Sequence, residues 1–170
     1  MKILNTFLTV VVILFFTSSC STNIDETFRS HQKVLLESMP SGSDIYMNGE
    51  FIGKTPMSLR LRSDINHEIK FQKEGFSTTN ESLSTIFKHE KQPYVQLGLA
   101  KDLGYYYELS SDHIIAELYW EPLPDTVGNM PFETMGELIA KADNALSSGT
   151  LALDEHKIII RQIIELFNTN

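Results

Sequence analysis

The dipeptide Asn48-Gly49 limits the fold of this chain more than any other short segment. It stands between two short runs with strand-forming residues, at 45–47 and 50–52. A type I′ turn needs positive φ at both of its central residues, and Asn and Gly tolerate this conformation best. The segment therefore predicts a tight β-hairpin.

Alternating apolar and polar residues after this hairpin predict further strands. Residues 57–62 place apolar side chains at every second position, and residues 67–72 do the same. A period of two turns one set toward a core and the other toward water. The apolar run at 34–36 and the segments 83–88 and 94–99 are three more candidates. We therefore expect a small antiparallel sheet structure over residues 33–100.

The turns of this region carry a resemblance to a known family. Residues 40–56, Pro-Ser-Gly-Ser-Asp-Ile-Tyr-Met-Asn-Gly-Glu-Phe-Ile-Gly-Lys-Thr-Pro, resemble the core of a PEGA domain, and residues 73–76, Lys-Glu-Gly-Phe, resemble its closing turn. The chain departs from the family where Pro-Ser-Gly-Ser replaces the usual Pro-Glu-Gly-Ala. The resemblance implies a compact antiparallel β-sandwich, used as an accessory module of envelope and extracellular proteins, with no catalytic residues.

The first twenty residues have the composition of an export signal. Lys2 is followed by a mainly apolar run at 3–16, by three small residues and by Cys20, the only cysteine of the chain. A positive start, a short apolar stretch and small residues before a cleavage point are typical of secretory signals. The apolar run is too short to favour a membrane-spanning helix.

The segment also resembles a bacterial lipoprotein signal, with Thr17-Ser18-Ser19-Cys20 in the place of the lipobox. This resemblance implies that Cys20 begins the mature chain and carries lipid on its sulfur and amino group. Several acyl chains anchor a protein stably where one does not. Ser21 after the cysteine resembles the pattern of lipoproteins sent to the outer membrane. We expect a signal peptide at 1–19 and a polar tether at 20–32, which could reach about 40 Å when extended.

Charge divides the rest of the chain into two parts. Residues 33–100 carry eight basic and eight acidic side chains, whereas residues 101–170 carry four basic and twelve acidic ones. The net charge of −8 therefore comes from the last part. An acidic chain lacks the basic face that a nucleic-acid binder needs. A single cysteine excludes a disulfide framework and a cysteine-based zinc site.

The acidic region at 101–170 changes from a strand pattern to a helical pattern. Strand-prone residues at 105–107 and at 114–120, joined by a polar turn, predict a β-hairpin. Apolar residues then recur with helical spacing, and Pro131 and Gly149 fit the start and stop of a helix. Asp154 is a candidate N-cap for a second helix. The stripe of the first helix comprises Phe132, Met135, Leu138, Ile139, Ala142 and Leu146.

We therefore expect a mainly β protein with α: a small antiparallel β-sandwich, then a β-hairpin, then a C-terminal two-helix hairpin. The short connection between the helices predicts an antiparallel pair.

No catalytic or metal-binding motif is visible in the sequence. None of the five His residues lies three or four positions from another, so no helical metal site is encoded locally. We expect no catalytic residue, no metal and no cofactor. The aromatic residues of the acidic region form either a core or a stacking platform for a ligand. The candidate binding residues are Tyr106, Tyr119 and Trp120, and the candidate lipid attachment site is Cys20.

These observations favour a non-enzymatic, lipid-anchored envelope protein, facing the periplasm from the outer membrane, that acts as a protein-interaction or structural module. Its expected partners are the membrane, through the lipid, and an envelope protein, with no nucleic acid. The acidic surface would attract a basic partner and repel anionic lipids. The alternative is a glycan- or peptidoglycan-binding module that uses the Tyr/Trp cluster. A periplasmic hydrolase with paired carboxylates is a third and less favoured hypothesis.

Overall fold

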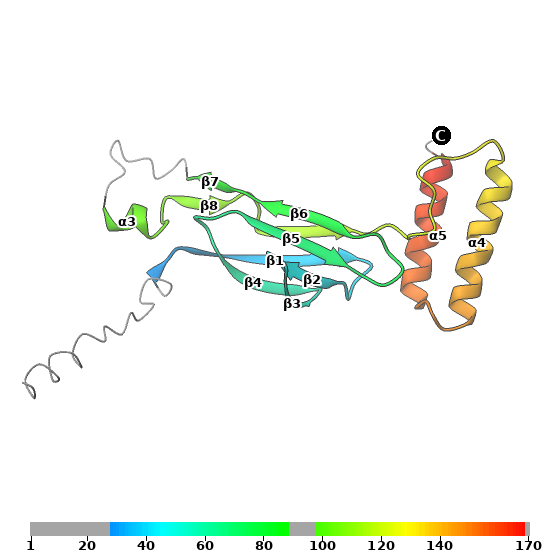
Figure 1. The fold of residues 1–170 in the computed structure, drawn as a ribbon, viewed down its shortest axis with the longest axis horizontal. Coiled ribbons are helices and arrows are strands. Elements are labelled where there is room, and N and C mark those ends of the chain that lie inside the picture. Colours follow the sequence, from blue (N-terminus) through cyan, green and yellow to red (C-terminus); the bar gives the residue numbers. More distant parts are fainter. Residues whose placement is uncertain (1–27, 89–97, 169–170) are drawn as a thin grey trace, which may run out of the picture.

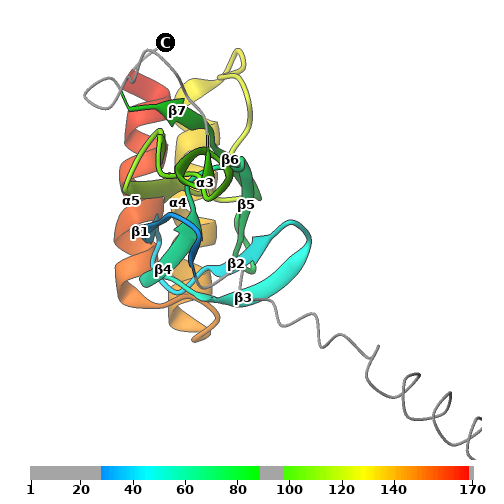
Figure 2. The same ribbon diagram turned by 90° about the vertical axis from the view of Figure 1, so that its left-hand side faces the viewer.

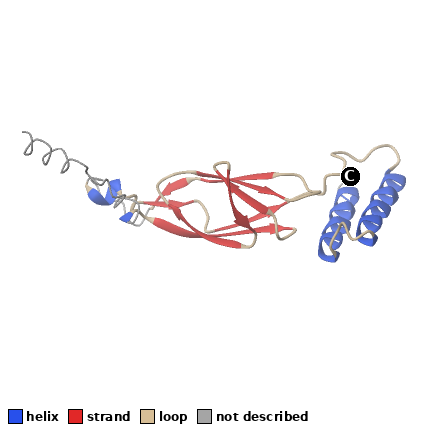
Figure 3. Ribbon diagram, turned by 60° about the horizontal axis from the view of Figure 1, so that its bottom comes forward, coloured by secondary structure: helices blue, strands red, loops and turns tan. Residues whose placement is uncertain are grey.

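A computed structural model describes residues 28–88 and 98–168. Strands occupy the middle of an elongated molecule, with a short helix at one end and two long helices at the other (Figures 1 and 3). The strands are β1 (His31–Met39), β2 (Asp44–Met47), β3 (Glu50–Lys54), β4 (Met57–Arg62), β5 (His67–Gln72), β6 (Thr79–Leu83), β7 (Thr85–Phe87), β8 (Tyr107–Leu109) and β9 (His113–Glu117). The helices are α3 (Leu99–Asp102), α4 (Pro131–Ser147) and α5 (Leu153–Asn168).

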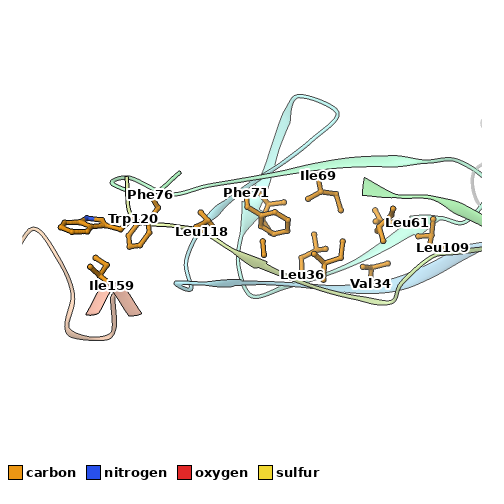
Figure 4. Packing of buried hydrophobic residues seen from close by; sticks show 14 of the residues in the cluster. Val34, Leu36, Leu61, Ile69, Phe71, Phe76, Leu109, Leu118, Trp120 and Ile159 are labelled. Carbon is orange, nitrogen blue, oxygen red and sulfur yellow. The ribbon is translucent and has the colours of Figure 1, made fainter. Parts of the chain in front are cut away.

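Two sheets enclose the core of the β unit. One sheet has the strand order β4-β1-β9, the other has the order β3-β2-β5-β6, and β7 and β8 form a separate pair. Val34 and Leu36 of β1 face Ile69 and Phe71 of β5 across the space between the sheets (Figure 4). All four side chains are buried because alternate residues of each strand point inward. The predicted β-sandwich is confirmed.

The hairpin predicted at Asn48-Gly49 is confirmed. The φ angles of these two residues are 51° and 89°, and Met47 pairs with Glu50 across the turn. The positive φ values explain why Asn and Gly occupy the turn, because a residue with a larger side chain is strained there. The hairpin forms the edge of the four-stranded sheet.

Ser43 and Thr55, motif residues before and after this hairpin, form a buried hydroxyl network with Ser38 of β1. The Ser38 Oγ lies 2.8 Å from the Ser43 Oγ and 2.6 Å from the Thr55 Oγ1. The Ser43 backbone N–H donates to the Thr55 Oγ1 at 3.0 Å, and the Ser43 side chain is fully buried. Because buried polar groups need partners, these residues join the turn at 40–43 to the end of β3. Their role is structural.

The acidic region contributes two strands, but they do not form the predicted hairpin with each other. β8 pairs with β7, whereas β9 runs parallel to β1. The backbone of β1 has two edges, and β4 satisfies only one of them, so β9 supplies the hydrogen bonds of the other. Ile114 and Ala116 of β9 are buried and complete the core. The β unit therefore continues past residue 101.

Three other strand boundaries differ from the sequence pattern. β6 was not expected, because its residues are mainly polar and three of its five side chains are exposed at the edge of a sheet. β7 covers only residues 85–87 of the segment expected at 83–88. Of the strand expected at 94–99, residues 94–97 lie outside the described residues, and Leu99 begins α3.

Helices α4 and α5 form the expected C-terminal pair. Pro131 occupies the first turn of α4, and Gly149 follows the end of α4 with a φ of 76°. Two details were wrong. Phe132 was placed on the apolar stripe but is 88% exposed, because the β unit does not reach the first turn of α4. Asp154 lies inside α5 and is not its N-cap.

The start of α5 is instead closed by Glu155. Its carboxylate accepts a hydrogen bond of 2.9 Å from the backbone N–H of Ala152, the residue before the helix. A Glu at the third helical position satisfies an otherwise unpaired N–H in this way. No helix of the described residues is long and apolar enough to cross a membrane.

Candidate functional site

The two long helices pack against one end of the sandwich, and the candidate binding surface lies beside this junction. Phe76 and Trp120, at the end of the sandwich, lie beside Ile159 of α5 (Figure 4). An isolated pair of bridging residues, Phe76 and Trp120, holds the two chain segments together there. The Lys73 ammonium lies 2.8 Å from the Glu155 carboxylate, and both side chains are largely buried. The junction is therefore apolar at its centre and charge-paired at one side.

Gln162 of α5 fixes the helix to the strand backbone. Its side-chain oxygen accepts from the Trp120 backbone N–H at 3.1 Å, and its NH₂ group donates to the Leu118 carbonyl at 2.9 Å. The Gln162 side chain is only 7% exposed. The Trp120 N–H and the Leu118 carbonyl lie just beyond the end of β9. The side-chain amide of Gln162 gives both of them a hydrogen-bond partner, as a neighbouring strand would.

A groove of about 510 Å³ opens beside this junction, between the segment 119–125 and α5. Three carboxylates, those of Glu121, Asp125 and Glu165, line it, and no basic side chain of the described residues does. The Arg161 guanidinium lies 3.8 Å from Glu165 on the exposed surface of α5. The remaining lining residues are Ser77, Tyr119, Trp120, Leu123, Pro124, Gln162 and Leu166. The groove therefore combines an acidic rim with apolar side chains.

The structure does not bring the three predicted aromatic residues together. Tyr119 is 54% exposed at the groove, whereas the neighbouring Trp120 is 7% exposed because successive residues of an extended chain point to opposite sides. The Lys141 ammonium lies 5.9 Å from the Trp120 ring centroid. Tyr106 stacks on Phe87 beside β7 and β8, at the end of the molecule that carries α3. Only Tyr119 remains an accessible ring at the groove.

A further pair of aromatic residues, Tyr46 and Phe51, was not identified from the sequence as a candidate binding surface. Tyr46 and Phe51 face each other across the β2–β3 hairpin, with ring centroids 5.6 Å apart, and Phe51 is 56% exposed. The Lys70 ammonium lies 4.5 Å from the Tyr46 ring centroid. A two-residue turn at 48–49 already implies that residue 46 opposes residue 51, so the signal was present. A shallow depression of about 530 Å³ beside the pair includes Asn48, Glu68, Asn80 and Ser82.

The first described residues are held at the other end of the sandwich. The Arg29 guanidinium lies 3.1 Å from the Asp64 carboxylate and donates to the Asp102 carbonyl at 3.2 Å. The Tyr105 hydroxyl donates to the Phe28 carbonyl at 2.8 Å. Figure 2 views the molecule from this end, with helices α4 and α5 behind the strands. The chain therefore enters the fold far from the groove.

Asp64 is the centre of this ionic cluster. The Arg62 guanidinium donates two hydrogen bonds to the Asp64 carboxylate, at 3.0 and 2.9 Å. These hydrogen bonds, opposed by burial and assisted by the charges of Arg62 and Arg29, hold the pKa of Asp64 below its usual value. The cluster fastens the N-terminal entry to the β4–β5 turn and to α3.

The described residues bring no three or more His, Cys, Asp or Glu side chains together as a group that could hold a metal ion. Cys20, the predicted lipid attachment site, lies outside the described residues.

Comparison with known proteins places one part of the chain in a family. Residues 32–100 match the PEGA domain family, so this chain contains a PEGA domain. The match ends before β8 and β9, although both strands contribute buried residues to the same core. No curated protein and no solved structure matches the chain.

Proposed function

We propose that this protein is a lipid-anchored, non-enzymatic component of the cell envelope that presents a protein-binding surface away from the membrane. The observation that carries the proposal is the arrangement of the two ends. Residues 28–30 are fixed at the α3 end of the sandwich, and the groove and helices lie at the opposite end (Figure 1). A lipid near the start of the chain would leave the groove facing away from the membrane.

The anchor itself rests on the sequence of the first twenty residues. An apolar run, three small residues and the only cysteine of the chain stand in an order that resembles a lipoprotein signal, with Thr17 where that family most often has Leu. Ser21 favours the outer membrane as the destination, with the folded part in the periplasm.

Protein binding is supported by the surface of the distal end. Its groove has an exposed Tyr119 among acidic and apolar side chains, and Tyr is frequent at the centres of protein interfaces. The PEGA domain supplies turns and a core, and Ser43 and Thr55 of its motif belong to the buried hydroxyl network. This division of roles favours a scaffold that carries an interaction surface over an enzyme.

The experiment compares the wild type with Cys20→Ala in intact cells, with Ser21→Ala as the control that keeps the sulfur. Metabolic labelling with an alkyne fatty acid reports the lipid, and crosslinking reports neighbours. We expect wild type and Ser21→Ala to be labelled and to capture the same envelope protein, and Cys20→Ala to do neither. Labelling of Cys20→Ala at the wild-type level would contradict the anchor. A wild type that captures no protein would contradict the adaptor role.

A second candidate function is glycan binding, with the cell wall as the ligand. The observation in its favour is the pair of a partly buried Tyr46 and an exposed Phe51, beside a shallow depression that amide and hydroxyl side chains line. Aromatic rings can stack on the apolar faces of sugars while amides bind hydroxyl groups. Phe51→Ala should then weaken sedimentation with purified cell wall several-fold, whereas Phe132→Ala, which changes an even more exposed ring on α4, should not. Equal sedimentation of both variants and the wild type would exclude this candidate.

A further inference from the structure

We propose that the groove beside α5 binds a basic peptide segment that carries at least one apolar side chain. The inference rests on the proposed function, because it names the chemistry of the partner that the distal end would bind. The groove is an existing concave surface of about 510 Å³, and it lies at the end opposite α3.

The apolar side chains of the groove determine the first requirement. Leu123 and Leu166 approach it from opposite sides, one from the loop after Trp120 and the other from α5. Leu123 is only partly buried although it packs against the core. An apolar side chain seated between these two residues would remove their remaining surface from water, which is the main favourable term in association.

The charges determine the second requirement. Glu121 and Asp125 lie on the loop and Glu165 lies on the facing helix, so carboxylates border the groove on both sides. Lys or Arg residues flanking the apolar side chain would meet these carboxylates, and complementary charge both accelerates association and selects the partner. A second copy of this acidic chain, an anionic lipid surface or an anionic glycan would bring like charges together.

The walls of the groove are held in place before any partner binds. Gln162 ties α5 to the backbone at Leu118 and Trp120, and the Leu123 backbone N–H donates to the Trp120 carbonyl at 3.0 Å. Proline at 122 and 124 restricts the same loop. A site that is already ordered loses less conformational entropy on binding, which strengthens binding to a short peptide.

The first test measures binding of the purified full-length protein to fluorescent peptides at physiological salt. The probes are a peptide that alternates Lys and Leu, one that alternates Glu and Leu, and one that alternates Lys and Ser. We expect saturable binding of the Lys-Leu peptide only. If the Lys-Leu peptide fails to bind, or binds no better than the Lys-Ser peptide, the proposal is overturned.

A matched pair of variants separates the groove from the overall negative charge. Glu121→Gln with Asp125→Asn removes two groove charges, and Asp112→Asn with Glu137→Gln removes two exposed charges that do not line it. We expect Kd for the Lys-Leu peptide to rise about tenfold in the first variant and less than about twofold in the second. Equal weakening by both would assign binding to net charge and overturn the proposal.

The test in cells places a photo-crosslinking amino acid at Tyr119, with Tyr105, at the opposite end, as the control position. The expected adduct at Tyr119 is a peptide with several Lys or Arg residues around an apolar one. An acidic peptide, a glycan or a second copy of this chain at Tyr119 would overturn the inference. If the wild type still captures an anchor-dependent partner, but only through Tyr105, the groove assignment is wrong and the adaptor role remains.

Discussion

The substitution Gln162→Leu tests how the helical pair is attached to the sandwich. Leu keeps a similar volume and helix propensity, so the change removes the two hydrogen bonds with little loss of packing. The Trp120 N–H and the Leu118 carbonyl would then lie unpaired beside a nearly buried side chain. Leaving a buried backbone group without a partner costs about 1–3 kcal/mol. We therefore expect the free energy of unfolding to fall by about 2–4 kcal/mol.

Trp120 bonds to Gln162 and also supplies the fluorescence signal for the measurement. It is the only Trp of the chain, so its fluorescence reports the junction directly. With a urea slope of about 1–3 kcal/mol per molar, the expected loss moves the fluorescence midpoint down by about 1–2 M. Hydrogen exchange should also quicken in α4 and α5 more than in β1 and β5, because the substituted contact joins the helices to the strands.

The matched control is Lys157→Leu, which introduces the same side chain at an exposed position of the same helix. We expect its free energy of unfolding to stay within about 0.5 kcal/mol of the wild type, as for most surface changes. If Gln162→Leu and Lys157→Leu give the same midpoint, the two hydrogen bonds do not hold the helices and the reasoning is refuted.

Three further predictions concern the sandwich and its N-terminal end. Because the pKa of Asp64 is lowered in the folded state, its ion pairs stabilise the fold above the unfolded pKa, and this contribution is lost as the pH falls through the folded pKa. The difference in urea midpoint between wild type and Asp64→Asn should therefore shrink from pH 5 to pH 3. A constant difference would contradict this prediction. Thr55→Val removes the hydroxyl that accepts the Ser43 N–H and should lower stability by about 1–3 kcal/mol in urea unfolding, whereas an unchanged midpoint would show that the network contributes nothing. At Gly104, where φ is +78° and an added Cβ would lie 2.7 Å from the Asp64 Cβ, alanine should cost about 1–3 kcal/mol in thermal unfolding; an unshifted midpoint would mean that the β4–β5 turn moves aside freely.

Local chemistry explains the elements that were predicted well. Asn48-Gly49 specifies its turn through the φ angles that its own backbone tolerates, and Pro131 begins α4 because its missing N–H needs no partner there. Neither choice depends on a distant residue. The alternation in β5 likewise fixes which of its side chains are buried, since a slip by one residue would expose Ile69 and Phe71.

Pairing between distant segments explains the errors. The residues of β8 and β9 have the pattern of strands. Their own sequences do not determine that β9 pairs with β1 or that β8 pairs with β7. β6 is polar because it lies at a sheet edge, so its own residues do not show it to be a strand. For Phe132, helical spacing gives the side of α4 on which it lies, but not how far the neighbouring β unit extends.

The features of the candidate site also separate into those that depend on residues near one another in the sequence and those that depend on tertiary packing. The sequence by itself determined the acidity of the last seventy residues, the hairpin and the two helices, because each depends on residues near one another in the chain. The proposed export signal with Cys20 likewise rests on the sequence alone. Only the tertiary structure decided that Tyr106 lies at the opposite end from Tyr119, and that Trp120 is buried. It also decided that Glu121 and Glu165, more than forty residues apart, border one groove. Contacts of that kind depend on how α5 packs on the sandwich, and the pattern of either segment alone does not contain that information.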